Sequence, residues 1–146
     1  MVAPLAQPSC RPDAPGVREI RAVASGIVAA DNRRDLQQVI DYYASDAVLL
    51  PPGEAPVAGR DKIRPRYEAL FAAFTPAIEL QIHEACAGAD LGFVRGHNGG
   101  RLVSRASGES RSLDDAFIMM LRLDGGSWRI SHLIWHRQSQ AAPRER

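Results

Sequence analysis

Apolar residues in the first half of the chain recur every three or four positions, the spacing of one face of a helix. The first such stretch runs from Val17 to Val28. Asp31 and Asn32 follow it, and both residue types favour turns and caps over helix interiors, so we expect the helix to end there. Asp35 is then the expected N-cap of a second helix, whose inward-facing residues are Leu36, Val39, Ile40 and Tyr43.

A third helix is expected from Asp61, its predicted N-cap, to about Phe74. Pro65 is compatible with this helix because it falls close to the first turn. Between the second and third helices, the run AVLL at residues 47–50 predicts a short strand, which Pro51 and Pro52 stop.

After Pro76 the apolar spacing changes from about 3.6 to 2, which indicates strands. Ile78, Leu80 and Ile82 alternate with polar residues. Two further strands, LGFVRGHN and RLVSRAS, are expected on either side of an NGG loop. The stretches LDDAFIMMLRL and WRISHLIWHRQ flank the tight connection DGGS. Helices followed by meandering strands predict an α+β domain.

Length and composition narrow the classes of protein. The chain has 146 residues, which favours one domain, and we place it at residues 16–138. Residues 1–15 hold four prolines and are expected to be a disordered tail, and residues 139–146 a solvated one. With 18 basic against 17 acidic side chains, the charge gives no reason to expect nucleic acid as a partner. No apolar run is long enough to span a membrane.

The two cysteines, Cys10 and Cys86, follow no segment that has the pattern of a secretory leader. We therefore expect two free thiols and a cytoplasmic protein. Neither a Cys-x-x-Cys nor a His-Glu-x-x-His spacing occurs, so no metal site is expected, and no cofactor is implied.

Two segments resemble a known superfamily: DLQQVIDYYASDAVLLPPGEAPVAGRDKIRPRYEALF at residues 35–71 and DGGSWRISHLIW at residues 124–135. The chain is similar to nuclear-transport-factor-2-like proteins, and more closely to the SnoaL-like and ketosteroid-isomerase-like members, including polyketide-cyclase-like and SgcJ/EcaC-type sequences. The resemblance implies a cone, in which a curved antiparallel sheet, as in cystatin-like folds, wraps round three N-terminal helices. It also implies an apolar cavity open at one end and a homodimer formed through the outer face of the sheet.

The steroid isomerase of this superfamily offers a test. Its aspartate base corresponds by this resemblance to Pro51, its tyrosine to Ile27 and its protonated aspartate to Met119. None of these three side chains can move a proton or donate a hydrogen bond, so we do not expect that mechanism here.

Two histidines in the last strand are the main candidates for chemistry. Residues two apart on a strand share a face, and the resemblance turns the face of His132, Ile134 and His136 into the cone. Asp115 shares a face of the preceding strand with Phe117 and Met119. His132 is then the candidate general base or acid, oriented by Asp115. The alternatives are a core imidazole at His132, a solvated strand end at His136, and an exposed acid at Asp115, with Asp114 facing inward instead.

The remaining candidates would bind substrate. Arg95 could hold a ligand oxygen, or form a surface ion pair. Tyr43 and Tyr67 could donate phenolic hydrogen bonds, or serve as core residues, and Ile27 would line the cavity. The sequence thus predicts an enzyme of proton transfer (isomerisation, cyclisation or hydration) acting on a small apolar carbonyl compound. The alternative is a ligand-binding or dimerisation module without catalysis, which a dry cavity with outward-turned histidines would favour.

Overall fold

The computed structural model describes residues 7–138, which form three helices and seven strands. In chain order these elements are α1 (Pro15–Arg33), α2 (Leu36–Asp41), β1 (Tyr43–Leu50), β2 (Val57–Ala58), α3 (Arg60–Ala73), β3 (Phe74–Ala87), β4 (Leu91–Ser104), β5 (Ser110–Ser112), β6 (Asp115–Asp124) and β7 (Ser127–Arg137). The predicted solvated tail at 139–146 lies outside the described residues.

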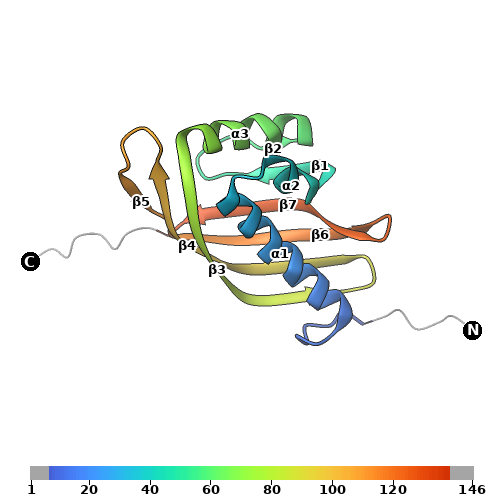
Figure 1. Cartoon of the computed structure of the whole chain (residues 1–146). Coiled ribbons are helices and arrows are strands. Elements are labelled where there is room, and N and C mark those ends of the chain that lie inside the picture. The colour runs from blue at the N-terminus through green and yellow to red at the C-terminus, as the bar shows by residue number, and fades with distance from the viewer. Residues whose placement is uncertain (1–6, 139–146) are drawn as a thin grey trace, which may run out of the picture.

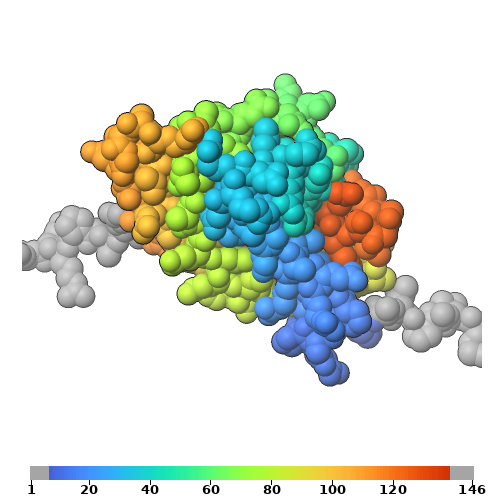
Figure 2. Space-filling model, viewed as in Figure 1, coloured from blue at the N-terminus to red at the C-terminus, as the bar shows by residue number. Residues whose placement is uncertain are grey.

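One curved sheet carries all the strands, in the order β2-β1-β7-β6-β4-β3, with β5 paired to β4. The helices cover one face of this sheet, and α1 crosses it diagonally (Figure 1). In the space-filling view α1, α2 and α3 hide much of that face, while the hairpin of β4 and β5 extends beyond them (Figure 2). The predicted α+β fold is confirmed. One detail is new: β1 pairs with β7 in parallel, and every other pairing is antiparallel.

Helix α1 buries an apolar stripe against the sheet. Val17, Ile20, Ala24 and Ile27 are each at most 4% exposed, and they recur every three or four residues. The helix continues past Asp31 and ends at Arg33, because Arg34 adopts a left-handed conformation and its N–H bonds the carbonyls of Ala30 and Asp31. The helix therefore ends within the stretch DNRRD at residues 31–35, as expected, but two residues beyond Asp31, which lies on the buried stripe.

The predicted N-cap of α2 is confirmed, and the predicted N-cap of α3 is wrong. Asp35 caps α2, since its carboxylate accepts a bond from the backbone N–H of Gln38 at 3.2 Å. Helix α3 begins at Arg60 after Gly59, so Asp61 lies in its first turn and is not the N-cap. Tyr43 is not helical: it is the first residue of β1, and it is fully buried.

Strand β4 was expected as two strands separated by a loop, but it runs unbroken for 14 residues. Gly100 allows the strand to continue, because its φ is +85° and a Cβ there would lie 2.1 Å from the carbonyl oxygen of Ala77. The long β3–β4 hairpin therefore forms one wall of the fold.

The segment before α1 is fastened to β3. Ser9 and Ala87 exchange two backbone hydrogen bonds of 2.8 Å, and a disulfide joins Cys10 to Cys86. The predictions of two free thiols, and of a disordered tail as far as residue 15, are wrong for residues 7–15; residues 1–6 lie outside the described part of the chain. The cytoplasmic location loses the support of free thiols. No helix in residues 7–138 is long and apolar enough to cross a membrane.

Candidate functional site

A cavity of about 450 Å³ lies between the helices and the face of the sheet that they cover. Most of its wall is apolar and comes from both layers: Ala24, Ile27, Val28, Leu49, Ala69, Leu70, Ile78, Leu80, Leu102, Leu113, Phe117, Met119, Leu133 and Trp135. Eight polar or charged residues interrupt it: Asp31, Tyr43, Arg66, Tyr67, Asn98, Arg111, Asp115 and Arg137. An apolar enclosure with a few polar groups is typical of a small-molecule site.

Strand register arranges the sheet side of this wall in rows. One row holds Phe117 and Trp135, which are cross-strand partners, with Gly96 on the far side of Phe117. Only glycine fits at position 96, because a Cβ would lie 2.3 Å from the Gln81 carbonyl oxygen and 3.0 Å from the Phe117 ring. The next row consists of Asn98, Asp115 and Arg137.

Asp31 is the more buried of the two carboxyls in the wall, with 9% of its surface exposed. Its neighbour Asn32 fixes the end of α1 on β3 by bonding both the N–H and the carbonyl of Ile78, at 2.8 and 3.0 Å. Burial raises the pKa of the Asp31 carboxyl to about 8. Its Oδ1 atom is buried and has no hydrogen-bond partner among residues 7–138. Asp31 is thus mainly protonated at neutral pH and can still exchange its proton near pH 8.

Two tyrosines stand next to this carboxyl. The hydroxyl oxygens of Tyr43, on β1, and Tyr67, on α3, are 2.6 Å apart and share a hydrogen bond. Burial raises the pKa of both phenols, and the nearby charge of Asp31 raises it further. Both therefore stay neutral. One hydroxyl donates to the other, which leaves one O–H free to donate to a third group. Helix α1, strand β1 and helix α3 together supply one carboxyl and two phenols.

A second polar group belongs to the row of Asn98, Asp115 and Arg137. Burial raises the pKa of Asp115, and the charge of Arg137 opposes that shift. The Oδ1 atoms of both Asn98 and Asp115 are buried without a hydrogen-bond partner in the described part of the chain. Buried polar atoms without partners are rare, and three of them line this cavity when Asp31 is included.

Arginines lie where the cavity opens. Arg66 bonds both carboxylate oxygens of Glu54, at 2.7 and 2.9 Å, and its guanidinium lies 5.6 Å from the centre of the Trp135 ring. Arg111 and Arg137 are exposed. No group of three or more potential metal-ligating side chains converges anywhere in residues 7–138.

His132 lies on the outer face of the sheet, so the prediction that its ring enters the cavity is wrong. The cause is a β-bulge: Leu121 pairs with Ile130 and Met120 with His132, which leaves Ser131 as an extra residue. Trp128 and Ile130 face inward, and the bulge turns Leu133 and Trp135 inward instead of His132 and Ile134.

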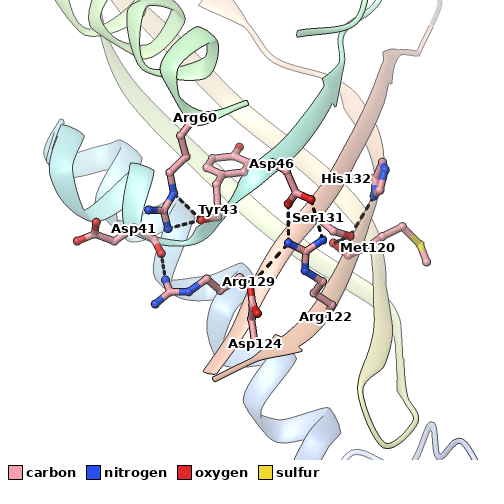
Figure 3. A network of polar contacts seen from close by, with 10 residues as sticks. All are labelled: Asp41, Tyr43, Asp46, Arg60, Met120, Arg122, Asp124, Arg129, Ser131 and His132. Atoms are coloured by element: carbon pink, nitrogen blue, oxygen red, sulfur yellow. Dashed lines mark hydrogen bonds and ion pairs between the residues drawn. The ribbon is translucent and has the colours of Figure 1, made fainter. Parts of the chain in front are cut away.

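On the outer face, Nδ1 of His132 lies 3.0 Å from Oγ of Ser131 (Figure 3). The ion pair of Asp46 with Arg122 is close by (Figure 3). The predicted pair of His132 with Asp115 does not form, because Asp115 lies across from Arg137 and faces the other side of the sheet.

Four of the predicted site residues lie outside the cavity. Besides His132, these are Ile134, which is 47% exposed, the exposed His136, and Arg95. Arg95 bonds Glu84 at 2.7 Å, which confirms the alternative of a surface ion pair. Asp114 bonds His97 at 2.5 Å and is exposed, so Asp115 is the inward-facing member of the acidic pair.

The other six predicted residues line the cavity: Ile27, Tyr43, Tyr67, Asp115, Phe117 and Met119. Their roles toward a ligand stay predictions. The sequence reasoning missed Asp31, although a signal was present, because Asp31 comes four positions after Ile27 and so extends the apolar stripe of α1. It also missed Asn98, Arg137 and Trp135, which face inward because of strand register.

A family model for the SnoaL-like domain matches residues 24–131, which is more than half of the chain. The chain belongs to the SnoaL-like domain family. The suspected superfamily is thereby confirmed, and solved structures agree with it. A ketosteroid isomerase-like protein from Erwinia carotovora atroseptica SCRI1043 is 27% identical, with a TM-score of 0.79 over 86% of this chain and 98% of that chain.

Two more distant structures share the fold. An NTF2-like protein of unknown function from Pseudomonas putida KT2440 is 22% identical, with a TM-score of 0.70, covering 86% of this chain and 88% of that chain. A protein with a cystatin-like fold from Nostoc punctiforme PCC 73102 is 16% identical, with a TM-score of 0.63, covering 81% and 87%. Among curated proteins, none matches this chain significantly.

Proposed function

We propose that this protein is an enzyme that moves a proton on a small, largely apolar carbonyl compound held in the cavity. One observation carries the proposal: Asp31, with a pKa of about 8, lies in an apolar wall beside the hydrogen-bonded pair of Tyr43 and Tyr67. A carboxyl whose pKa lies near the working pH is suited to general acid–base catalysis. Strongly shifted pKa values in a cavity are typical of functional sites.

The proposed chemistry is an isomerisation. The ionised carboxylate of Asp31 takes a proton from the carbon next to the substrate carbonyl, and the electron pair of that C–H bond moves to form an enolate. The free O–H of the tyrosine pair donates a hydrogen bond to the enolate oxygen, where negative charge develops. In a substrate with a β,γ double bond the enolate is a dienolate, so Asp31 returns its proton to the γ carbon, the double bond moves into conjugation with the carbonyl, and Asp31 is ionised again. No other reactant is consumed, and the protein returns to its starting state.

The residues differ from those expected by analogy with the steroid isomerase. Ile27 and Met119 line the cavity as apolar side chains, so two of the three expected positions offer no proton-moving group there. Asp31, Tyr43 and Tyr67 offer such groups from other positions. The relative named ketosteroid isomerase-like supports the reaction class, because it covers nearly the whole fold at 27% identity.

The test follows deuterium uptake at the carbon next to the carbonyl of 2-tetralone, a two-ring apolar ketone, by nuclear magnetic resonance in heavy water. We expect the wild-type protein to accelerate uptake, and Asp31→Asn to lower the rate by about 100-fold or more. His132→Ala is the matched control, because His132 lies on the outer face, and it should leave the rate unchanged.

Two results would reject the proposal. If Asp31→Asn exchanges deuterium as fast as the wild type, Asp31 is not the proton carrier. If calorimetry shows that 2-tetralone binds, but the wild-type protein does not accelerate its deuterium exchange above the rate without protein, the cavity is a ligand-binding module without catalysis.

We also propose that the chain forms a homodimer through the outer face of the sheet. Ile118 and Ile134 are cross-strand partners on this face, and they are 41% and 47% exposed. Met120, two residues from Ile118, is 40% exposed. Adjacent exposed apolar side chains on a sheet face favour association, because their burial removes apolar surface from water.

A further inference from the structure

The cavity holds a second polar group that the proposed proton transfer does not use. Asn98 and Asp115 are cross-strand partners on β4 and β6, and both line the cavity. Each has a buried Oδ1 atom without a hydrogen-bond partner in residues 7–138. A carboxylate oxygen can only accept hydrogen bonds, so this row offers acceptor capacity that the described protein does not fill.

Asp115 and Asp31 reach the cavity from different layers, Asp115 from strand β6 and Asp31 from helix α1. Asp31 is 9% exposed, and its charge acts on the phenols of Tyr43 and Tyr67, whereas Asp115 is half-buried at the first position of β6. The charges that act on Asp115 are those of Arg137, Asp114, His97 and His136, and Asp31 is not among them. Phe117 and Met119 follow Asp115 on the same face of β6, and both give the cavity wall apolar surface next to this row.

We propose that the row of Asn98 and Asp115 binds a hydrogen-bond donor, a hydroxyl or amine, at the end of the substrate remote from its reacting carbonyl. The substrate class is therefore an apolar ring compound with a carbonyl at one end and a donor group at the other. This inference rests on the proposed function for the position of the carbonyl. The site for the donor group is inferred independently, from the unpaired Oδ1 atoms of Asn98 and Asp115.

The register keeps Asp115 aimed at this position. Burial raises the pKa of Asp115, and the positive charge of Arg137, which lies across from it on β7, opposes that rise. Asp114, the adjacent acid, bonds His97 and is exposed. The two neighbouring aspartates thus form a matched pair, of which only one faces the cavity.

The test compares three ligands by isothermal titration calorimetry at neutral pH: 2-tetralone, 6-hydroxy-2-tetralone and 6-methoxy-2-tetralone. The hydroxyl can donate a hydrogen bond and the methoxy group cannot. We expect the wild type to bind the hydroxy compound at least about tenfold more tightly than the methoxy compound, since hydrogen bonds to charged groups are among the stronger ones. Asp115→Leu should abolish this preference, and Asp114→Leu should keep it.

Equal affinity of the wild type for the hydroxy and methoxy compounds would overturn the inference, as would a preference that survives in Asp115→Leu. If Asp115→Leu does not fold, Asn98→Leu replaces it and should reduce the preference by several-fold; an unchanged preference there also overturns the inference. Measuring the same three ligands with Asp31→Asn separates the two proposals. A preference that persists there supports the Asn98–Asp115 row even if Asp31 proves not to carry a proton.

Discussion

The hydroxyl oxygens of Tyr43 and Tyr67 lie 2.6 Å apart, although one residue begins a strand and the other lies in a helix 24 positions later. Tyr43 is fully buried, and its backbone carbonyl accepts hydrogen bonds from the Arg60 guanidinium at the start of α3. That contact holds α3 against β1, so the two phenols meet at the cavity wall. Their shared hydrogen bond leaves one O–H to act on a ligand or on Asp31.

Replacing Tyr67 by Phe tests this pair. The variant keeps the ring but loses the hydroxyl, so we expect folding to be retained with a loss of about 0.5–1.5 kcal/mol in the free energy of unfolding. Deuterium uptake by 2-tetralone should fall by about 10- to 100-fold, because one donor to the enolate oxygen is removed or misplaced. Tyr42→Phe is the control, since Tyr42 does not line the cavity, and it should exchange at the wild-type rate. An equal loss in both variants would contradict a role for the pair.

Asp31 makes the stability of the fold depend on pH. Its pKa is about 8 in the folded protein, against an ordinary value of 3.8. Between these values the unfolded chain has released the proton that the folded protein retains. Raising the pH from about 4 to about 8 therefore lowers the free energy of unfolding, by up to about 1.4 kcal/mol per pH unit from this group. Above pH 8 both states are ionised, and the contribution levels off.

The comparison with Asp31→Asn isolates this effect. The amide does not titrate, so urea unfolding at a series of pH values should show the variant gaining stability relative to the wild type as the pH rises through that window. Asp114→Asn, at an exposed acid, supplies the control. A stability difference between Asp31→Asn and the wild type that does not vary between pH 4 and pH 8 would mean that the Asp31 carboxyl is not buried as described.

Apolar periodicity was sufficient to predict the helices, most of the strands and the α+β class, because each element buries one stripe or one face, while the sheet wrapped round the helices was implied by the resemblance. The resemblance to the steroid isomerase, and not periodicity, turned Ile27 and Met119 toward the cavity, and Phe117 followed because it shares a strand face with Met119. Asp31 was missed because an aspartate was taken as a sign of a turn or cap, although its position four residues after Ile27 continues the buried stripe. A carboxyl on a buried stripe is costly unless it is neutral or paired, so its place there was itself a sign of function.

The histidines of β7 were misplaced for a different physical reason. Alternation from Trp128 and Ile130, which do face inward, puts His132 on the inner face, and this remains true only if the pairing is regular. The extra residue, Ser131, reverses the alternation beyond it. The bulge is a property of how β6 pairs with β7, and the only local sign of its effect was the apolar pair Leu133 and Trp135 on the alternate positions.

The disulfide of Cys10 with Cys86 should contribute strongly to stability. It joins residues 76 positions apart, and closing a loop of that length in the unfolded chain corresponds to about 4 kcal/mol. We expect Cys10→Ser to lower the midpoint of thermal unfolding by about 10 °C or more. A reducing agent should lower the unfolding midpoint of the wild type by a similar amount and leave the midpoint of the variant unchanged. If the reductant changes neither protein, the bond is not formed in solution.

A single charged substitution on the outer face should disrupt the proposed dimer without unfolding the chain. Ile134→Lys places an ammonium beside Ile118 on the outer face, where it would lose its hydration in a contact between two copies. Sedimentation equilibrium should find the wild type as a dimer and this variant as a folded monomer, since Ile134 is already 47% exposed in the single chain. Leu123→Lys is the control, because Leu123 is 38% exposed but pairs with the inward-facing Trp128, so it lies on the opposite face of the sheet from Ile118 and Ile134. A monomeric wild type, or a dimer that only Leu123→Lys disrupts, would refute association through this face.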